Sequence, residues 1–146
     1  MPRAFVVQKA IFKSNDSEIL MSLKNQSFDW RSSVILWGGN GSIQFPTAKS
    51  EARILDYQPT YVKIAVNTTN PGFIVLSDTY YPGWAAYLNG ARVPILRANY
   101  AFRAIKLSDG HSTVEFKYEP LSVYLGTAIT FIALIIIIAA SLWRRK

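Results

Sequence analysis

Polar and aromatic side chains gather in two short stretches of the sequence, residues 78–81 and 97–100. Aromatic rings offer apolar faces for stacking against a sugar, and a guanidinium group binds phosphate through a planar fork of donors. We therefore predict a ligand-binding patch suited to sugar rings or to a lipid-linked phosphate. Its candidate residues are Asp78, Tyr80, Tyr81, Arg97, Asn99 and Tyr100. The alternative is a structural role, in which Asp78 and Asn99 cap backbone groups and the tyrosines cover one end of the fold.

Residues for catalysis or metal binding form no recognisable arrangement in the sequence. The single histidine, His111, follows an Asp-Gly turn, whereas a nucleophile with its base, or a metal site, needs further converging groups. Glycoside cleavage commonly uses paired carboxylates, and Asp56, Asp78, Glu115 and Glu119 are available, but Glu115 and Glu119 fall on the outward side of an alternating strand. We predict no catalytic residue, no metal and no cofactor. A self-contained surface hydrolase is the least favoured function.

Two turn signals shape the segment between the two stretches. Pro82-Gly83 fits the centre of a type II turn, where proline presets the first φ and glycine accepts a positive second φ. Asn89-Gly90 is the preferred pair for a type I′ hairpin. The hairpin register places on one face the pairs Leu88 with Ala91, Ala86 with Val93 and Trp84 with Ile95, and on the other face Tyr87 with Arg92. Because its cross-strand neighbours are apolar, Trp84 is predicted to pack in the core rather than against a ligand.

The hydrophobic pattern of residues 1–119 predicts a mainly β fold. Short apolar or alternating runs predict six to eight strands, among them residues 4–7, 33–37, 53–57, 61–66, 73–77, 102–107 and 113–119. Residues 73–77 are a continuous apolar run, which indicates a strand buried on both faces. Residues 14–18 supply capping groups for one short helix that ends near Lys24-Asn25, and residues 38–50 are predicted to be a loop. We predict a β-sandwich, jelly-roll-like, with the helix as an addition.

Residues 121–143 contain no charged side chain and predict a single transmembrane helix. A helix of this length rises about 35 Å, enough to cross a hydrocarbon core of about 30 Å. Tyr124 and Trp143 mark its two interfaces, and the basic residues 144–146 are expected in the cytoplasm. The predicted organisation is therefore an extracytoplasmic domain at residues 1–119, followed at 120–146 by the helix and a short basic cytoplasmic tail. The lipid bilayer is its first expected partner, and the cell membrane its location.

Charge and cysteine content exclude several other classes of protein. The formal net charge is +7, of which residues 144–146 supply three charges, and no basic run interleaved with aromatics is present. We therefore expect no nucleic-acid partner. The chain contains no cysteine, so it forms no disulfide, thiol catalyst or cysteine metal site.

The start of the chain carries no recognisable export signal, because residues 1–7 have neither a long apolar segment nor a small-residue cleavage site. A lone C-terminal span would then leave its domain in the cytosol. Either the expected orientation is wrong, or the chain is the end of a longer polytopic protein whose upstream helices direct translocation.

Several motifs resemble a known family. The run "FIVLSDTYYPGWAAYLNGARVPILRANYAFRAIKL" and the later "GHSTVEFKYEPLSVYLG" resemble the C-terminal end of the bacterial YfhO membrane proteins. The family consists of large polytopic proteins related to membrane glycosyltransferases of the C-type fold. "PRAF" near the start and "FDW" at residues 28–30, where the family more often has Phe-Asp-Pro, extend the resemblance over essentially the whole chain.

The resemblance implies a parent that transfers a sugar from a polyprenyl-phosphate donor outside the cytoplasmic membrane, often onto envelope polymer. The catalytic acids of such enzymes belong to an N-terminal membrane region that is absent from this sequence, so no catalytic residue is carried over. We expect a non-catalytic extracytoplasmic domain that contacts an envelope glycan, a lipid-linked sugar or the missing polytopic region. The alternative is a membrane-tethered protein-interaction domain with no role in sugar chemistry.

Overall fold

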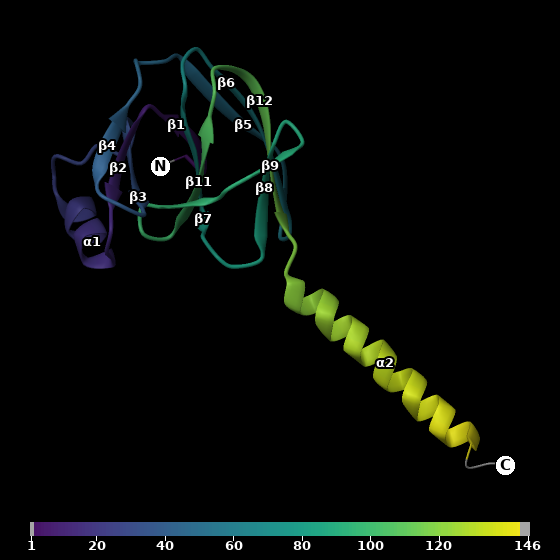
Figure 1. Ribbon diagram of the computed structural model, residues 1–146. Helices are drawn as coiled ribbons and strands as arrows, with labels where there is room; N and C mark the ends of the chain where they lie inside the picture. Colours follow the sequence, from purple (N-terminus) through teal and green to yellow (C-terminus); the bar gives the residue numbers. More distant parts are fainter. Residues whose placement is uncertain (1, 144–146) are drawn as a thin grey trace.

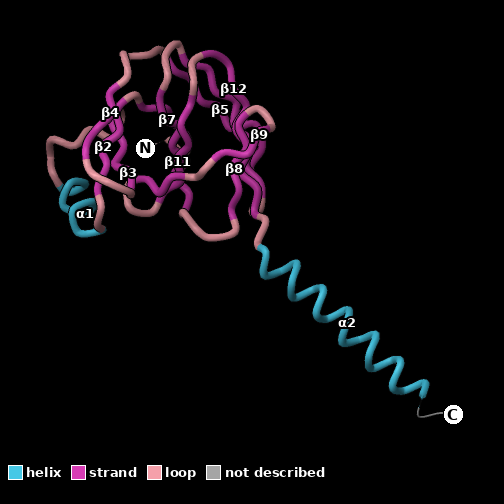
Figure 2. The backbone as a smooth tube through the Cα atoms, viewed as in Figure 1, coloured by secondary structure: helices cyan, strands magenta, loops and turns pink. Residues whose placement is uncertain are grey.

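The computed structural model describes residues 2–143, which form two β-sheets packed face to face and a long helix that projects away from them (Figures 1 and 2). The seven-stranded sheet has the order β1-β7-β11-β10-β3-β2-β4, and the five-stranded sheet has the order β5-β6-β12-β8-β9. The first sheet contains β1 (Ala4–Val7), β2 (Lys9–Lys13), β3 (Ser33–Trp37), β4 (Gly41–Gln44), β7 (Gly72–Thr79), β10 (Leu96–Ala98) and β11 (Phe102–Leu107). The second contains β5 (Ser50–Gln58), β6 (Tyr61–Thr68), β8 (Trp84–Leu88), β9 (Ala91–Val93) and β12 (Gly110–Tyr118). The predicted mainly β, two-sheet fold is confirmed.

Strand β7 is buried on both faces, as its continuous apolar run predicts. Ile74 and Leu76 face the core between the two sheets, where they meet the inward side of β6, β11 and β12. Phe73 and Val75 face a second core on the other side of the seven-stranded sheet. Phe45 covers that side, with its ring 6.1 Å from the Phe73 ring. The seven-stranded sheet is thus covered on both faces around β7.

Helix α1 (Asp16–Lys24) follows the capping signals in the sequence. The Asn15 side chain accepts a hydrogen bond from the Glu18 backbone N–H at 2.8 Å and donates one to the Glu18 carboxylate at 2.6 Å. The Asn15 side chain thus caps one backbone N–H of the first turn, and the Glu18 carboxylate holds that side chain in place. Ile19 is fully buried and fixes the helix to the sheet. The predicted position of this helix is confirmed.

The described residues contain twelve strands, more than the six to eight predicted. Strand β4 lies inside the predicted loop at 38–50, β2 was not predicted, and β10 lies in the segment assigned to a loop around Arg97. These strands are short, and β4 is an exposed edge strand with no alternating pattern. Their formation depends on pairing with β2, β3 and β11, which the local sequence does not encode.

The β8–β9 hairpin has the predicted register at Ala86–Val93, Tyr87–Arg92 and Leu88–Ala91. Asn89 and Gly90 both have positive φ, as a type I′ turn requires. The expected Trp84–Ile95 pair is wrong. Strand β9 ends at Val93, before a proline that has no N–H to donate, so the β8–β9 register stops at Ala86–Val93. On the other edge of β8, Trp84 pairs with Tyr118 of β12.

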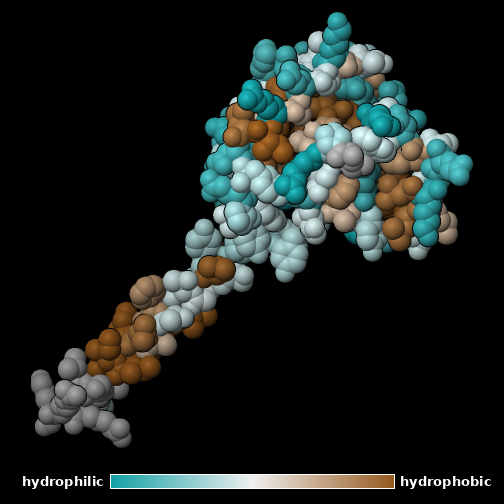
Figure 3. All heavy atoms as spheres, turned by 180° about the vertical axis from the view of Figure 1, so that it is seen from behind, coloured by the Kyte–Doolittle hydropathy of each residue, from teal (hydrophilic) through white to brown (hydrophobic). Residues whose placement is uncertain are grey.

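Helix α2 spans Leu121–Trp143, the range predicted from the sequence. Its segment Leu121–Ile138 has a mean hydropathy of 2.5 and is not buried against the sandwich, so α2 is long and apolar enough to cross a membrane. Figure 3 shows it as a hydrophobic shaft below a more polar head. Only Glu119 and Pro120 separate the end of β12 from the start of α2.

Candidate functional site

A cleft of about 550 Å³ opens at the end of the sandwich from which α2 departs. It lies between the β5–β6 turn, the end of β7 and the start of β8. The backbone N–H of Tyr118 donates to the Thr60 carbonyl at 2.9 Å, and Tyr118 pairs with Trp84. The β5–β6 turn and the start of β8 therefore lie beside the residues that lead into α2.

Asp78 is the central residue of the cleft. Its carboxylate accepts hydrogen bonds from Nη2 of Arg103 at 3.2 Å and from the Tyr57 hydroxyl at 3.1 Å, and it lies 3.5 Å from Nε of Arg3. The register between β7 and β11 shifts here, since Leu76 pairs with Arg103 while Thr79 pairs with Phe102. This bulge places Asp78 at the cleft, because extra residues in one strand re-aim its side chains.

Arg103 forms the floor of the cleft. Its side chain is 3% exposed, and its guanidinium lies 3.9 Å from the centroid of the Trp84 ring and 5.2 Å from that of Phe116. Burial lowers the pKa of Arg103, and the adjacent Asp78 carboxylate opposes that shift. Within residues 2–143, Nε and Nη1 of this side chain have no hydrogen-bond partner. A buried donor left without a partner costs stability, so the Asp78 contact is important for holding the charge in place.

Tyr57 and Arg3 form one wall of the cleft. The Arg3 guanidinium lies 4.3 Å from the centroid of the Tyr57 ring, an arrangement that favours a cation–π attraction. The Tyr57 hydroxyl donates a hydrogen bond to Asp78, and burial together with the Asp78 carboxylate raises the pKa of Tyr57. Tyr81 lies at the rim and is 60% exposed.

These residues are suited to binding a polar ring compound. Tyr57, Tyr81 and Trp84 provide aromatic surface, and two guanidinium groups beside one carboxylate give the lining a net charge of +1. Asp78 is the only carboxylate among the described lining residues, and it is held in an ion pair. The lining therefore lacks the two carboxylates that common glycoside cleavage uses.

The structure divides the predicted patch into two groups. Asp78 and Tyr81 line the cleft, and Tyr80 lies just beside it, where its backbone N–H donates to the Ala101 carbonyl. Arg97, Asn99 and Tyr100 lie elsewhere, in and after β10.

The second group makes contacts that hold secondary elements together. Arg97 pairs with Asp16 of α1 at 3.0 Å and stacks on Tyr100. Asn99 is buried, its side-chain Oδ1 accepts from the Ile35 N–H at 2.9 Å, and its own N–H donates to the Ile35 carbonyl at 2.7 Å. Ligand binding by these three residues stays a prediction, while their contacts link β10 to β3 and α1.

Nine of the eleven described lining residues were not among the candidates, and four of these supply the charged and aromatic groups of the cleft: Arg3, Tyr57, Trp84 and Arg103. Arg103 carried a usable signal, because it shares the inward side of β11 with Ile105 and Leu107, where a charged residue is unusual. Trp84 packs partly against the core, as predicted, and also lines the cleft. Arg3 and Tyr57 reach the site through tertiary folding and carried no local signal.

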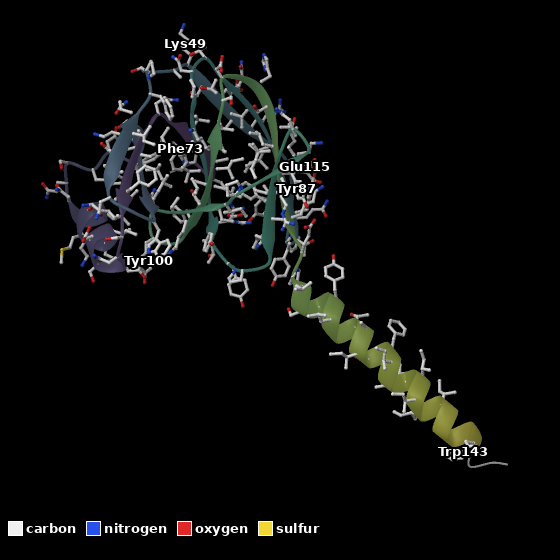
Figure 4. The ribbon with its side chains drawn as sticks, in the orientation of Figure 1. Lys49, Phe73, Tyr87, Tyr100, Glu115 and Trp143 are labelled. Atoms are coloured by element: carbon white, nitrogen blue, oxygen red, sulfur yellow. The ribbon has the colours of Figure 1, made fainter. Side chains whose placement is uncertain are left out.

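A separate group of charges lies on the outer face of the five-stranded sheet. Glu115 accepts a hydrogen bond from the Tyr61 hydroxyl at 2.9 Å and lies 3.0 Å from Nζ of Lys117 and 3.5 Å from Nζ of Lys63. The contacts with Lys117 and Tyr61 lower the pKa of Glu115, and Glu115 raises the pKa of Lys117. Figure 4 shows Glu115 and Tyr87 on this face.

The two packed sheets and the projecting apolar helix define a β-sandwich protein with one candidate transmembrane helix among its described residues. Residues 46–130 match the sequence profile of the family described as "Bacterial membrane protein YfhO". The matched range covers more than half of the chain, from the β5 region to the first part of α2, and includes every cleft residue named above except Arg3. The chain therefore belongs to the YfhO family. No curated protein and no solved structure matches the chain.

Proposed function

We propose that the sandwich is a non-catalytic, extracytoplasmic saccharide-binding domain. In this role α2 anchors the domain, and the cleft holds part of an envelope glycan or a lipid-linked sugar near the membrane surface. The proposal rests on one observation, the convergence of Tyr57, Tyr81 and Trp84 with two guanidinium groups in a cleft at the α2 end of the sandwich. The volume of about 550 Å³ lies within the range of small-molecule sites.

The electrostatics of the cleft favour an acidic saccharide over a neutral one. The lining charge of +1 arises from Arg3 and Arg103 against Asp78, and Arg3 is 54% exposed at the mouth. A phosphate or carboxylate on the saccharide would approach Arg3 without displacing the buried Asp78–Arg103 pair. The aromatic rings would then stack against the sugar.

The orientation in this proposal follows from the basic residues 144–146, which favour a cytoplasmic C-terminus. The sandwich then lies outside the cytoplasmic membrane. Its partners are the lipid bilayer, the glycan or lipid-linked sugar, and the polytopic membrane region that the family resemblance implies.

The test is a binding titration of the full chain in lipid nanodiscs with a panel of neutral and acidic envelope saccharides. Tyr81→Ala and Arg3→Gln should each weaken binding about two- to tenfold, the range expected for one aromatic or exposed charged contact. Tyr100→Ala and Arg97→Gln test the other half of the predicted patch, and unchanged binding in these two variants would confine the saccharide to the cleft. Undiminished binding in both cleft variants would contradict the proposal. A folded chain that binds no saccharide would favour the alternative role in protein interaction.

A further inference from the structure

The loop between β7 and β8, residues 80–83, is attached to the start of α2. The backbone N–H of Glu119 donates to the Gly83 carbonyl at 2.6 Å. Gly83 has φ +98°, and a Cβ built on it would lie 2.9 Å from Cε2 of Tyr118 and 3.2 Å from Cβ of Pro120. The loop is therefore packed directly against the residues that lead into α2. We call residues 80–83 the membrane-side loop.

The membrane-side loop carries two exposed aromatic residues close to the beginning of the apolar helix. Tyr80 is 40% exposed and Tyr81 is 60% exposed, and Tyr124 in the first turn of α2 is 63% exposed. In Figure 1 the loop lies at the edge of the sandwich below β7 and β8, on the side from which α2 departs. Tyrosine is enriched where a protein crosses from water to lipid, because its ring is apolar and its hydroxyl is polar.

The charges next to the loop are of both signs. Asp78, which precedes the loop, is paired with Arg103 and accepts from Tyr57. The carboxylate of Glu119 accepts a hydrogen bond from the Tyr87 hydroxyl at 3.1 Å. The charge of Asp78 is thus balanced by an ion pair, whereas Glu119 keeps its negative charge, and the Arg3 guanidinium at the cleft mouth is 54% exposed and available to a lipid phosphate.

We infer that the membrane-side loop docks on the bilayer crossed by α2, with Tyr80 and Tyr81 in the headgroup layer. The occupant of this surface is lipid, because the loop is hydrogen-bonded to, and packed against, the residues that lead directly into the apolar helix. Docking holds the sandwich at a fixed orientation, with the α2 end toward the headgroups. This inference does not depend on which side of the membrane the sandwich occupies or on saccharide binding.

Single-cysteine labelling tests the inference cleanly, since the natural sequence contains no cysteine. The full chain would carry a nitroxide at Tyr81→Cys and, in a control, at Lys49→Cys at the opposite end of the sandwich from α2 (Figure 4). Both samples would be placed in nanodiscs of phosphatidylcholine and phosphatidylglycerol. Collision with a water-soluble nickel chelate should be at least threefold lower at position 81 than at position 49, and collision with oxygen should be higher. Equal nickel accessibility at the two positions would overturn the inference.

A second measurement uses a label outside the membrane-side loop to report the position of the sandwich relative to the bilayer. A fluorophore at Lys49→Cys reports its distance to acceptor dyes on the lipid headgroups by energy transfer. In Tyr80→Ser/Tyr81→Ser the distribution of this distance should broaden, because the loop no longer rests on the bilayer. Tyr100→Ser, another exposed tyrosine in a turn, should leave the distribution unchanged. An unchanged distribution in the folded double variant, as judged by circular dichroism, would also overturn the inference.

Discussion

The Asp78 carboxylate lies 3.2 Å from Nη2 of Arg103, and this ion pair joins the bulged end of β7 to the inward side of β11. The pair is sheltered, since the Arg103 side chain is 3% exposed and that of Asp78 is 12% exposed. The Trp84 ring lies over the guanidinium at 3.9 Å. The Asp78–Arg103 pair therefore links β7 to β11 at the floor of the cleft, next to Trp84, which packs against the core.

Asp78→Asn should lower the free energy of unfolding by about 3 kcal/mol, because it leaves the buried Arg103 charge without its counterion. Urea unfolding of the full chain in detergent micelles, followed by tryptophan fluorescence, measures this change. Asp56→Asn, on β5, where the carboxylate accepts a hydrogen bond from the exposed Gln58 side chain, is the matched control and should change it by no more than about 0.5 kcal/mol. Equal effects of the two variants would argue against the importance of the pair.

Arg103→Met should cost less than Asp78→Asn, because methionine packs against Trp84 and Phe116 while Asp78 keeps Arg3 and Tyr57 as partners. The double variant should lose less stability than the sum of the two single variants. The same urea experiment supplies all four values of the cycle. Additive losses would indicate that Asp78 and Arg103 act independently.

Gly83→Ala should destabilise the chain more than Gly90→Ala. Both glycines have positive φ, so both variants incur a backbone cost of about 1 kcal/mol. Only at Gly83 does the added Cβ also meet Tyr118 and Pro120, while no atom lies within 4 Å at Gly90. Thermal unfolding in micelles compares the two, and an equal shift would mean that the packing at Gly83 relaxes freely.

The Glu115 carboxylate should stabilise the folded state at neutral pH and lose that effect in acid. Its pKa is lowered in the folded state by contact with Lys117 and Tyr61. A lowered carboxyl pKa contributes stability above the pKa of the unfolded chain, and this contribution disappears as the pH falls through the folded value. Wild type should therefore be more stable than Glu115→Gln at pH 7, and the difference should vanish below the folded pKa.

Urea titrations across this pH range measure the difference between wild type and Glu115→Gln. Glu51→Gln, at an exposed position on β5, is the control and should show a much smaller pH-dependent difference from wild type. A constant difference between wild type and Glu115→Gln at all pH values would contradict the assigned ion contacts.

Asn99→Ala should lower the free energy of unfolding by about 2–3 kcal/mol. The change places alanine at φ 44°, which costs about 1–2 kcal/mol, and it removes the acceptor of the buried Ile35 N–H. Asn99→Gly tolerates the same φ and should lose about 1–2 kcal/mol from the missing hydrogen bond. Unfolding curves of the two variants give the comparison, and a larger loss in the glycine variant would refute this account.

Local patterns were sufficient for the elements that the sequence encodes within a few residues. The capping group at Asn15, the Asn89-Gly90 turn, the apolar run of β7 and the uncharged segment of α2 each appear where the sequence indicated. Short strands such as β4 and β10 owe their conformation to neighbours far away in the chain. Propensity is weak over three or four residues, and tertiary pairing decides their structure.

The residues of the cleft also divide into those that local sequence indicated and those that only tertiary folding brings together. Asp78 and Tyr81 were found because they stand beside a recognisable Pro-Gly corner, which the fold does place at the cleft. Arg3 is brought to Asp78 by the pairing of β1 with β7, and Tyr57 by the packing of the two sheets. Arg103 could have been predicted, because a charge on the inward side of a strand is unusual, but its pairing with Asp78 could not.

Because only two residues connect β12 to α2, the orientation of the sandwich is tied to that of the helix. The hydrogen bond from Glu119 to Gly83 further restrains the connection between the sandwich and α2. A transmembrane helix whose apolar length exceeds the hydrocarbon thickness tilts more in a thin bilayer than in a thick one. In a thin bilayer the helix tilt and the contact inferred for the membrane-side loop would act against each other, and the loop contact would keep the mouth of the cleft facing the headgroups as thickness varies.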